Sequence, residues 1–312
     1  MTKHLSWLKL LGFLLLSCSV SVYSQNGSAN EIQNGYELLK GERFDSAISV
    51  FSNVLRADPD SYQARLGLAI ALVGVDKYSD ASREIAKLLA RTPNDARLLE
   101  LAAQTFWQQK RLSEAETVLK RRLNMGNERP DIWSLYGDVL DAQKRTIEAV
   151  SAYEKAVSLD PNSIDLRYAL GSLYWKRIRY DDAEREFLEV LRRQPNEPRS
   201  SFNLGDIYLS KGDASKALPY LETAVRAFPD EYDTRLALGK ADLATNKFAE
   251  AIEQLQAAIK LRPDIAEGHY QLALSLQKAG RRDEAKAEFK TTQELQKAKR
   301  ESETVPIPKQ NQ

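Results

Sequence analysis

The sequence has few of the residues that form disulfides, metal sites or nucleophilic centres. It contains one cysteine and two histidines among 312 residues. A single cysteine excludes a disulfide framework and every zinc or iron–sulfur site that needs several thiolates. The glycine-rich phosphate loop and the HExxH, GxSxG and CxxC motifs are also absent. The sequence therefore predicts no cofactor, no metal and no enzymatic activity.

Positive and negative charges are almost equal in number. The chain carries 45 Lys and Arg against 44 Asp and Glu, a formal net charge of +1, and it has no long basic run. Because nucleic-acid binding depends on clustered Lys and Arg, we expect no nucleic-acid partner. Apolar residues make up 43% and charged residues 29% of the chain, which fits a folded protein.

No apolar run approaches the length of a membrane span. The N-terminus has Lys3 and Lys9, then an apolar run over residues 10–16, then a serine-containing stretch to Ser24. A span needs about 20 apolar residues, whereas this order is typical of a secretory signal peptide. We expect an exported protein, periplasmic or secreted, that loses residues 1–24. A buried amphipathic first helix is the alternative.

Two cleavage routes remain open. Small residues precede Gln25, which suits an ordinary signal peptidase. The run Leu-Leu-Ser-Cys that ends at Cys18 resembles a bacterial lipoprotein box, in which residues 1–17 are removed and Cys18 becomes a lipid anchor at the outer membrane. Leu16 is unusual at its place in such a box, so we expect release before Gln25.

A strict repeat of 34 residues organises the rest of the chain. Three columns keep this spacing, one of alanine, one of tiny residues and one of large apolar residues, and most repeats also have a proline in register. A fixed period of this size indicates a solenoid of repeated hairpins. The columns are Ala47, Ala81, Ala115, Ala149, Ala183, Ala217, Ala251 and Ala285; Gly35, Ala69, Ala103, Gly137, Gly171, Gly205, Gly239 and Ala273; and Phe51, Ile85, Leu119, Tyr153, Phe187, Leu221, Leu255 and Phe289.

Each repeat is predicted to be two amphipathic helices joined by a turn. In the fifth repeat, Leu170 and its neighbours recur at helical spacing, and Phe187 and Leu191 do so again. Gly171 would let the two helices approach closely, and Pro195 would end the second helix. A lone hairpin cannot bury its apolar face, so the stack is the expected folding unit.

The repeats set the expected boundaries. They begin near residues 28, 62, 96, 130, 164, 198, 232 and 266, within an array over 25–299. Residues 300–312 contain two prolines and end in Gln-Asn-Gln, so they are predicted to be a disordered tail.

These columns closely resemble the tetratricopeptide repeat (TPR) family. The fourth repeat supplies the family's pattern most fully, with Trp133, Gly137, Leu140, Ala149, Tyr153 and Pro161. The resemblance implies an all-α, right-handed superhelix of eight hairpins and, with the leader, an exported bacterial member. It also implies a concave groove, lined by the first helix of each hairpin, that holds peptides or partner segments.

The groove residues follow from projecting each first helix. We call the face formed by positions two, five, nine, twelve and thirteen of each repeat the inner face. Large aromatics there are frequent binding anchors, although they could instead pack between neighbouring helices. Our preferred hot spot is Tyr168, Trp175 and Phe202. The full predicted set is Tyr36, Trp107, Asp138, Asp141, Tyr168, Trp175, Lys176, Phe202, Asp206 and Tyr270.

Acidic residues gather on the inner face of the third to fifth repeats. By charge complementarity they favour a partner segment that carries Lys or Arg. Ordinary solvation of an exposed face is the alternative. These acids are Glu100, Asp131, Asp138, Asp141 and Asp165.

The third repeat departs from the pattern. Asn127 replaces its proline, and Arg122 stands where the neighbouring repeats have Val, Leu or Ala. Sequence drift with Gly126 ending the helix is one interpretation. A soft joint between the third and fourth repeats is the other.

Three functions remain, and we favour the first. It is a non-catalytic scaffold for protein–protein interaction, in the assembly of a cell-envelope or secretion complex. The second is an exopolysaccharide- or glycan-associated protein, since aromatic faces can stack on sugars. The third is an enzyme or enzyme subunit, although His269 falls in the family's Trp column and no carboxylate pair stands out.

The leader gives a direct prediction. The mass of the mature protein, measured on material purified from the cells that export it, should correspond to an N-terminal Gln25. A diacyl-modified Cys18 would establish the lipoprotein route, and retention of residues 1–24 would contradict both.

Overall fold

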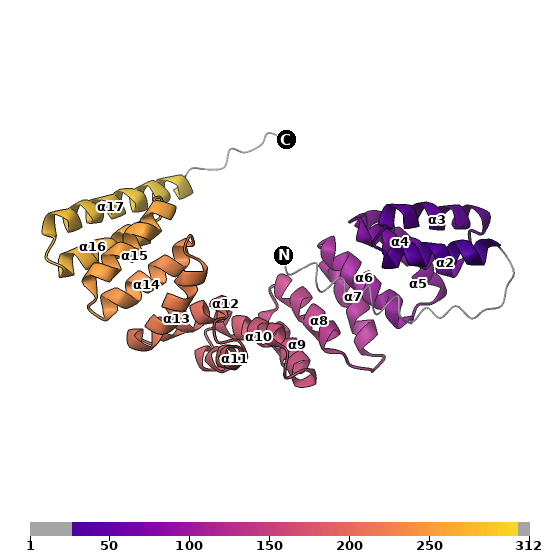
Figure 1. Ribbon diagram of the computed structural model, residues 1–312, viewed down its shortest axis with the longest axis horizontal. Helices are drawn as coiled ribbons and strands as arrows, with labels where there is room; N and C mark the ends of the chain where they lie inside the picture. The colour runs from indigo at the N-terminus through magenta and orange to yellow at the C-terminus, as the bar shows by residue number, and fades with distance from the viewer. Residues whose placement is uncertain (1–26, 305–312) are drawn as a thin grey trace. The chain divides into compact units, whose positions relative to one another are not determined.

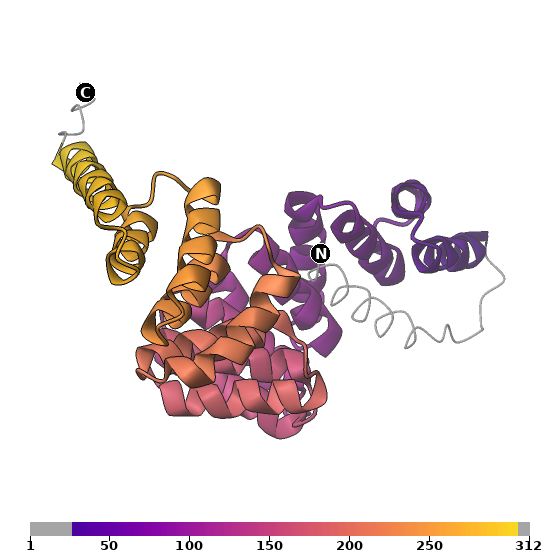
Figure 2. The same ribbon diagram turned by 60° about the vertical axis from the view of Figure 1, so that its left-hand side comes forward.

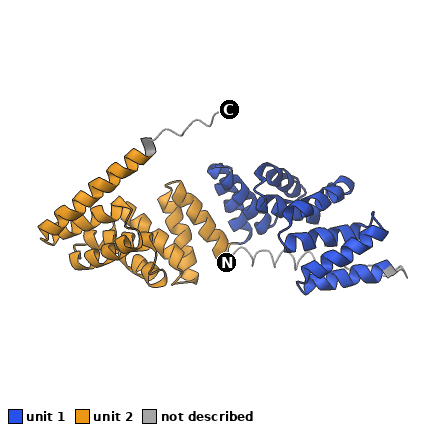
Figure 3. Cartoon of the chain, turned by 90° about the horizontal axis from the view of Figure 1, so that it is seen from above, with its two compact units in different colours: residues 1–160 blue, residues 161–312 orange. Residues whose placement is uncertain are grey.

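Helices account for the whole regular structure of the described residues. The computed structural model describes residues 27–304, which contain sixteen α-helices and no strand. The predicted leader, including Cys18 and Gln25, lies outside them. The chain divides into two compact units, Met1–Asp160 and Pro161–Gln312 (Figure 3). Within residues 27–304, no helix combines the length and apolarity needed to cross a membrane.

Unit 1 contains four hairpins that stack in chain order (Figure 1). Each consists of a first helix and a second helix of nearly equal length. The bounds are α2 (Gly27–Lys40), α3 (Phe44–Ala57), α4 (Tyr62–Gly74), α5 (Tyr78–Arg91), α6 (Ala96–Gln108), α7 (Leu112–Leu123), α8 (Pro130–Ala142) and α9 (Thr146–Leu159).

Unit 2 repeats the same arrangement, and its last helix is the longest (yellow in Figure 2). The bounds are α10 (Ile164–Lys176), α11 (Tyr180–Arg193), α12 (Pro198–Ser210), α13 (Ala214–Ala227), α14 (Tyr232–Ala244), α15 (Phe248–Leu261), α16 (Ala266–Lys278) and α17 (Arg282–Thr304). The predicted all-α fold of eight hairpins is confirmed.

One contact recurs between the two helices of a hairpin. A Cβ atom placed on Gly171 would lie 2.9 Å from the ring of Phe187, and one on Gly137 would lie 2.5 Å from the ring of Tyr153. Both rings are buried, and so is Ala183, one turn before Phe187 on α11. The tiny residue of the first helix therefore makes room for the large residue of the second, as predicted.

Each hairpin turn depends on one residue with left-handed backbone geometry. In the fifth repeat this is Ile178, with φ 59°. The next amide, that of Arg179, donates to the carbonyl of Tyr174 at 2.9 Å, which closes the helix end in a Schellman motif. A β-branched residue is strained in this conformation. The equivalent residues are Glu42, Asp76, Lys110, Lys144, Gly212, Asn246 and Gly280.

A buried ion pair organises the irregular end of the third repeat. Helix α7 ends at Leu123, and the loop after it has left-handed residues at Gly126 and Asn127. Arg122 is buried; its Nε donates to Glu100 of α6 at 2.6 Å and its Nη1 to the Gly126 carbonyl at 3.1 Å. Arg122 thus ties the loop to α6 of the same repeat, and the soft joint between the third and fourth repeats stays a hypothesis.

The C-terminal helix differs from the expected boundary. Helix α17 continues to Thr304, so residues 300–304 are helical where a disordered tail was predicted. Arg300 and Glu301 are strong helix formers, and Lys297 lies 3.8 Å from Glu301 in an i, i+4 pair. Residues 305–312 lie outside the described part of the chain.

The ion pair in the third repeat can be tested by a double-mutant cycle. The preceding repeat has Leu66 and Leu88 at the two corresponding positions, both buried. Glu100→Leu alone should lower the free energy of unfolding by about 3 kcal/mol, because it leaves the buried guanidinium of Arg122 without a carboxylate partner. Arg122→Leu alone should cost less, because Arg129 still pairs with Glu100. The double variant should regain most of that loss, since it reproduces an apolar contact. Additive losses in urea denaturation would contradict this account.

Candidate functional site

The first helices of unit 2 line an open groove of about 660 Å³ on their inner face. Its lining comes from α10, α12, α14 and α16. Apart from Ala237 and Gln271, every lining residue occupies position two, five, nine, twelve or thirteen of its repeat. Leu209, Leu236 and Leu243 supply apolar surface. The cavity is therefore an inner-face groove built by repetition.

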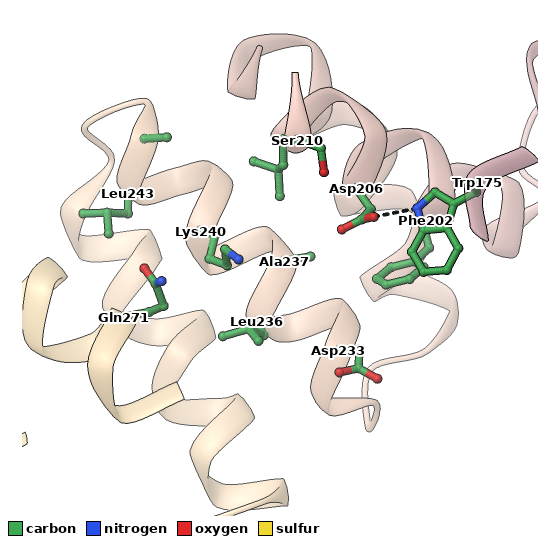
Figure 4. Close-up of a pocket in the computed structure, with 12 residues that line it drawn as sticks. Trp175, Phe202, Asp206, Ser210, Asp233, Leu236, Ala237, Lys240, Leu243 and Gln271 are labelled. Carbon is green, nitrogen blue, oxygen red and sulfur yellow. Dashed lines mark hydrogen bonds between the residues drawn. The ribbon is translucent and has the colours of Figure 1, made fainter. Parts of the chain in front are cut away.

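An aromatic pair marks one end of this groove (Figure 4). Trp175, on the last turn of α10, is 36% exposed, and Phe202 on α12 is half-buried. The Trp175 indole Nε1 donates to Oδ2 of Asp206 at 2.8 Å. This hydrogen bond fixes the indole plane while its face stays accessible to a ligand.

Three charged side chains border the groove. Asp206 and Asp233 form no ion pair with any described residue of the chain. Lys240 lies farther along α14, 3.7 Å from Glu267. The groove is therefore negatively charged on the side of Asp206 and Asp233 and positively charged at Lys240, and a bound segment would need complementary charges.

The other predicted residues of unit 2 lie outside the cavity lining. Tyr168 is half-buried, with the guanidinium of Arg199 4.3 Å from its ring centre. Lys176 is exposed at the end of α10. Tyr270 is 39% exposed and packs edge-on against Phe289 at 6.1 Å. Of the preferred hot spot, the structure places Trp175 and Phe202 in one cavity and Tyr168 beside Arg199.

Unit 1 places two predicted aromatics differently. Tyr36 is only 4% exposed, since its ring packs against Phe51 and its hydroxyl donates to the Gln63 carbonyl at 3.0 Å. It lies in the core, which corrects the groove prediction for this residue. Trp107 is half-buried, with the ammonium of Lys110 4.9 Å from its ring centre.

The acids of unit 1 interact within the protein. Asp138 accepts a hydrogen bond from the Tyr153 hydroxyl at 2.6 Å, and Asp141 accepts one from Thr146 at 3.2 Å. Glu100 is buried against Arg122, and Arg129 pairs with both Glu100 and Asp131. Of the acidic residues predicted on the inner face of the third to fifth repeats, Glu100 and Asp131 are therefore paired with arginine, Asp138 and Asp141 accept hydrogen bonds from neutral hydroxyls, and Asp165 is exposed.

His269 has the structural role that its column predicts. It is 8% exposed; its Nδ1 lies 2.6 Å from Glu288 and its Nε2 3.1 Å from the Pro263 carbonyl. Arg167 makes the equivalent contacts in the fifth repeat, to Glu186 and to the Pro161 carbonyl. Within residues 27–304, no three His, Cys, Asp or Glu side chains gather closely enough to hold a metal ion.

Sequence reasoning missed one buried carboxylate. Asp242 on α14 is 5% exposed, and desolvation raises its pKa to about 6 against the opposing charge of Lys247. The carboxylates of Glu250, Glu222 and Glu253 raise it further. The signal was present in the sequence, because the other members of this column are Leu38, Leu72, Phe106, Leu140, Tyr174, Tyr208 and Leu276.

Comparisons with known proteins agree with this architecture. Family models described as tetratricopeptide repeat match residues 168–232 and residues 38–105 with 208–267, and a TPR repeat model matches 137–177. A search of curated proteins found no match. The fold defines a helical-repeat solenoid protein. Because the three models together match well over half of the chain, it belongs to the tetratricopeptide repeat family.

Solved structures share the fold. MamA from Desulfovibrio magneticus RS-1 is 23% identical, with a TM-score of 0.52 over 56% of this chain and 98% of its own. MamA AMB-1 is 27% identical, with a TM-score of 0.50 over 53% and 98%. YrrB, described as a TPR protein with an unusual peptide-binding site, is 22% identical, with a TM-score of 0.53 over 59% and 95%.

Asp242 should make stability depend on pH in a defined window. Its carboxyl ionises near pH 4 in the unfolded chain and near pH 6 in the folded protein. Stability is therefore highest below pH 4 and falls by roughly 2–3 kcal/mol as pH rises to about 6, through this group alone. Asp242→Asn should remove that part of the pH dependence and stabilise the protein at pH 7.5. Urea denaturation of both proteins from pH 4 to 7.5 tests this; parallel curves would contradict it.

Proposed function

We propose that this protein is a non-catalytic scaffold whose inner face in unit 2 holds a segment of a partner protein. The observation that carries the proposal is the groove itself, a cavity of about 660 Å³ with the exposed Trp175 at one end. A tryptophan face beside leucine side chains offers a large apolar contact at a low entropic cost.

The chemistry of the groove supports binding rather than catalysis. Its polar side chains are Asp206, Ser210, Asp233, Lys240 and Gln271. None of them is arranged with a neighbouring base as a nucleophile requires. Membership of the TPR family agrees with a scaffold, and YrrB shows that the same fold is associated with a peptide-binding site in another protein.

The cellular setting in this proposal comes from the leader. With a signal peptide over residues 1–24, the scaffold would act in the periplasm or outside the cell, in the assembly of an envelope or secretion complex. If Cys18 were lipidated instead, the same groove would operate at the outer membrane. The partner in either setting is a protein or peptide.

Site-specific photocrosslinking in intact cells tests the groove. A photoreactive amino acid at Ser210, on the cavity rim, should give a discrete cross-linked partner, whereas one at Glu222, exposed on α13, should not. Trp175→Ala should reduce the Ser210 adduct at least about tenfold, as expected for a buried aromatic anchor. Equal adducts at Ser210 and Glu222, or an adduct indifferent to Trp175→Ala, would contradict the proposal. Circular dichroism of the variant controls for folding.

A further inference from the structure

The chain pairs aromatic rings with arginine in several places. The guanidinium carbon of Arg199 lies 4.3 Å from the centre of the Tyr168 ring, and that of Arg179 lies 4.4 Å from the Tyr174 ring. Arg199 also donates to Glu197 at 3.0 Å. An aromatic face, a guanidinium and a carboxylate thus form one stabilised group on the inner face.

The next repeat has the aromatic ring and the carboxylates but not the arginine. Phe202 corresponds to Tyr168, and Asp233 takes the place of Arg199, each 34 residues later. Among the described residues, no cation of the chain lies over the ring of Phe202 or of Trp175. Asp233 is therefore an acid at the position where Arg199, one repeat earlier, is a cation stacked on an aromatic ring.

Two further features favour a cation at this place. Trp175 presents an exposed face, and its hydrogen bond to Asp206 leaves the other lone pairs of that carboxylate available. Asp206 and Asp233 belong to adjacent first helices, and both line the same cavity (Figure 4). Two carboxylates that form no ion pair within the described residues, lining the same cavity as two aromatic rings, are complementary to a planar cation.

We propose that the aromatic end of the groove, formed by Trp175, Phe202, Asp206 and Asp233, recognises an arginine side chain of the partner segment. This inference rests on the proposed function and specifies its partner. Arginine fits better than lysine because its planar guanidinium can stack on a ring while donating two parallel hydrogen bonds to a carboxylate. The partner's arginine would stack on Phe202 as Arg199 stacks on Tyr168, one repeat earlier in the chain.

Matched peptides test the proposal in solution. The probe is a fluorescein-labelled peptide, Ala-Leu-Gly-Arg-Gly-Leu-Ala, with blocked ends. Three comparison peptides carry citrulline, lysine or glutamate in place of arginine. Citrulline keeps the shape of arginine without its charge. Fluorescence anisotropy should show the arginine peptide binding at least about tenfold more tightly than the citrulline peptide, with a difference that shrinks at high salt. The indole N–H resonance of Trp175, assigned with Trp175→Phe, should shift on binding.

Variants identify the residues responsible. Asp206→Asn and Asp233→Asn should each weaken binding of the arginine peptide about three- to fivefold. Asp233→Arg should remove the preference for arginine over citrulline, because the chain then supplies its own cation at the position equivalent to Arg199. The matched control is Asp283→Asn, which removes an exposed acid on the second helix α17, outside the cavity lining; it should change affinity less than about twofold.

The outcomes separate this inference from the proposed function. Equal binding of the arginine and citrulline peptides, with a shifted Trp175 resonance, would contradict arginine recognition but would still support peptide binding in the groove. Tightest binding of the glutamate peptide would also overturn it, in favour of Lys240 as the selective group. If no peptide shifted the Trp175 indole resonance while the Ser210 cross-link to a partner persisted, arginine recognition would be wrong, and the proposed scaffold function would still hold. Absence of both the resonance shift and the Ser210 cross-link would contradict arginine recognition and the proposed scaffold function together.

Discussion

The structure depends on one contact between the helices of each hairpin: a large apolar side chain of the second helix fills space that a glycine or alanine leaves on the first. Several of these glycines leave no room for a Cβ atom, as Gly171 against Phe187 shows. Because the contact returns every 34 residues, each hairpin adopts the same geometry and presents its first helix on the same face. The repeated geometry places side chains from successive first helices next to one another, which is how Trp175, Phe202 and Asp233 come to line one groove.

Periodicity made the helical hairpins predictable from the sequence. The columns of Ala183, Gly171 and Phe187 have the burial and contacts expected of them, because a repeated environment selects the same residue type at each return. The turn residues were harder to find. Gly212, Gly280 and Asn246 indicate a left-handed position, but Ile178 in the same column conceals it, because its own preference opposes the conformation that the hairpin imposes.

The candidate site was only partly predictable, for a different physical reason. Helical projection identifies which residues share a face, so Trp175, Phe202 and Asp206 could be named from spacing. Projection does not show which charges are neutralised. Glu100 was expected to face a ligand and is buried against Arg122, whereas Asp233 lines the cavity without an ion pair within the described residues. Pairing depends on side chains from different repeats, which no single helix specifies.

The central claim is that the first helices of unit 2 hold a partner segment, and hydrogen exchange of the complex isolated with its partner tests it most directly. The account predicts slower amide exchange in α10, α12, α14 and α16 than in the free protein, with α11, α13 and α15 changed little. Protection confined to those second helices, or to unit 1, would contradict it.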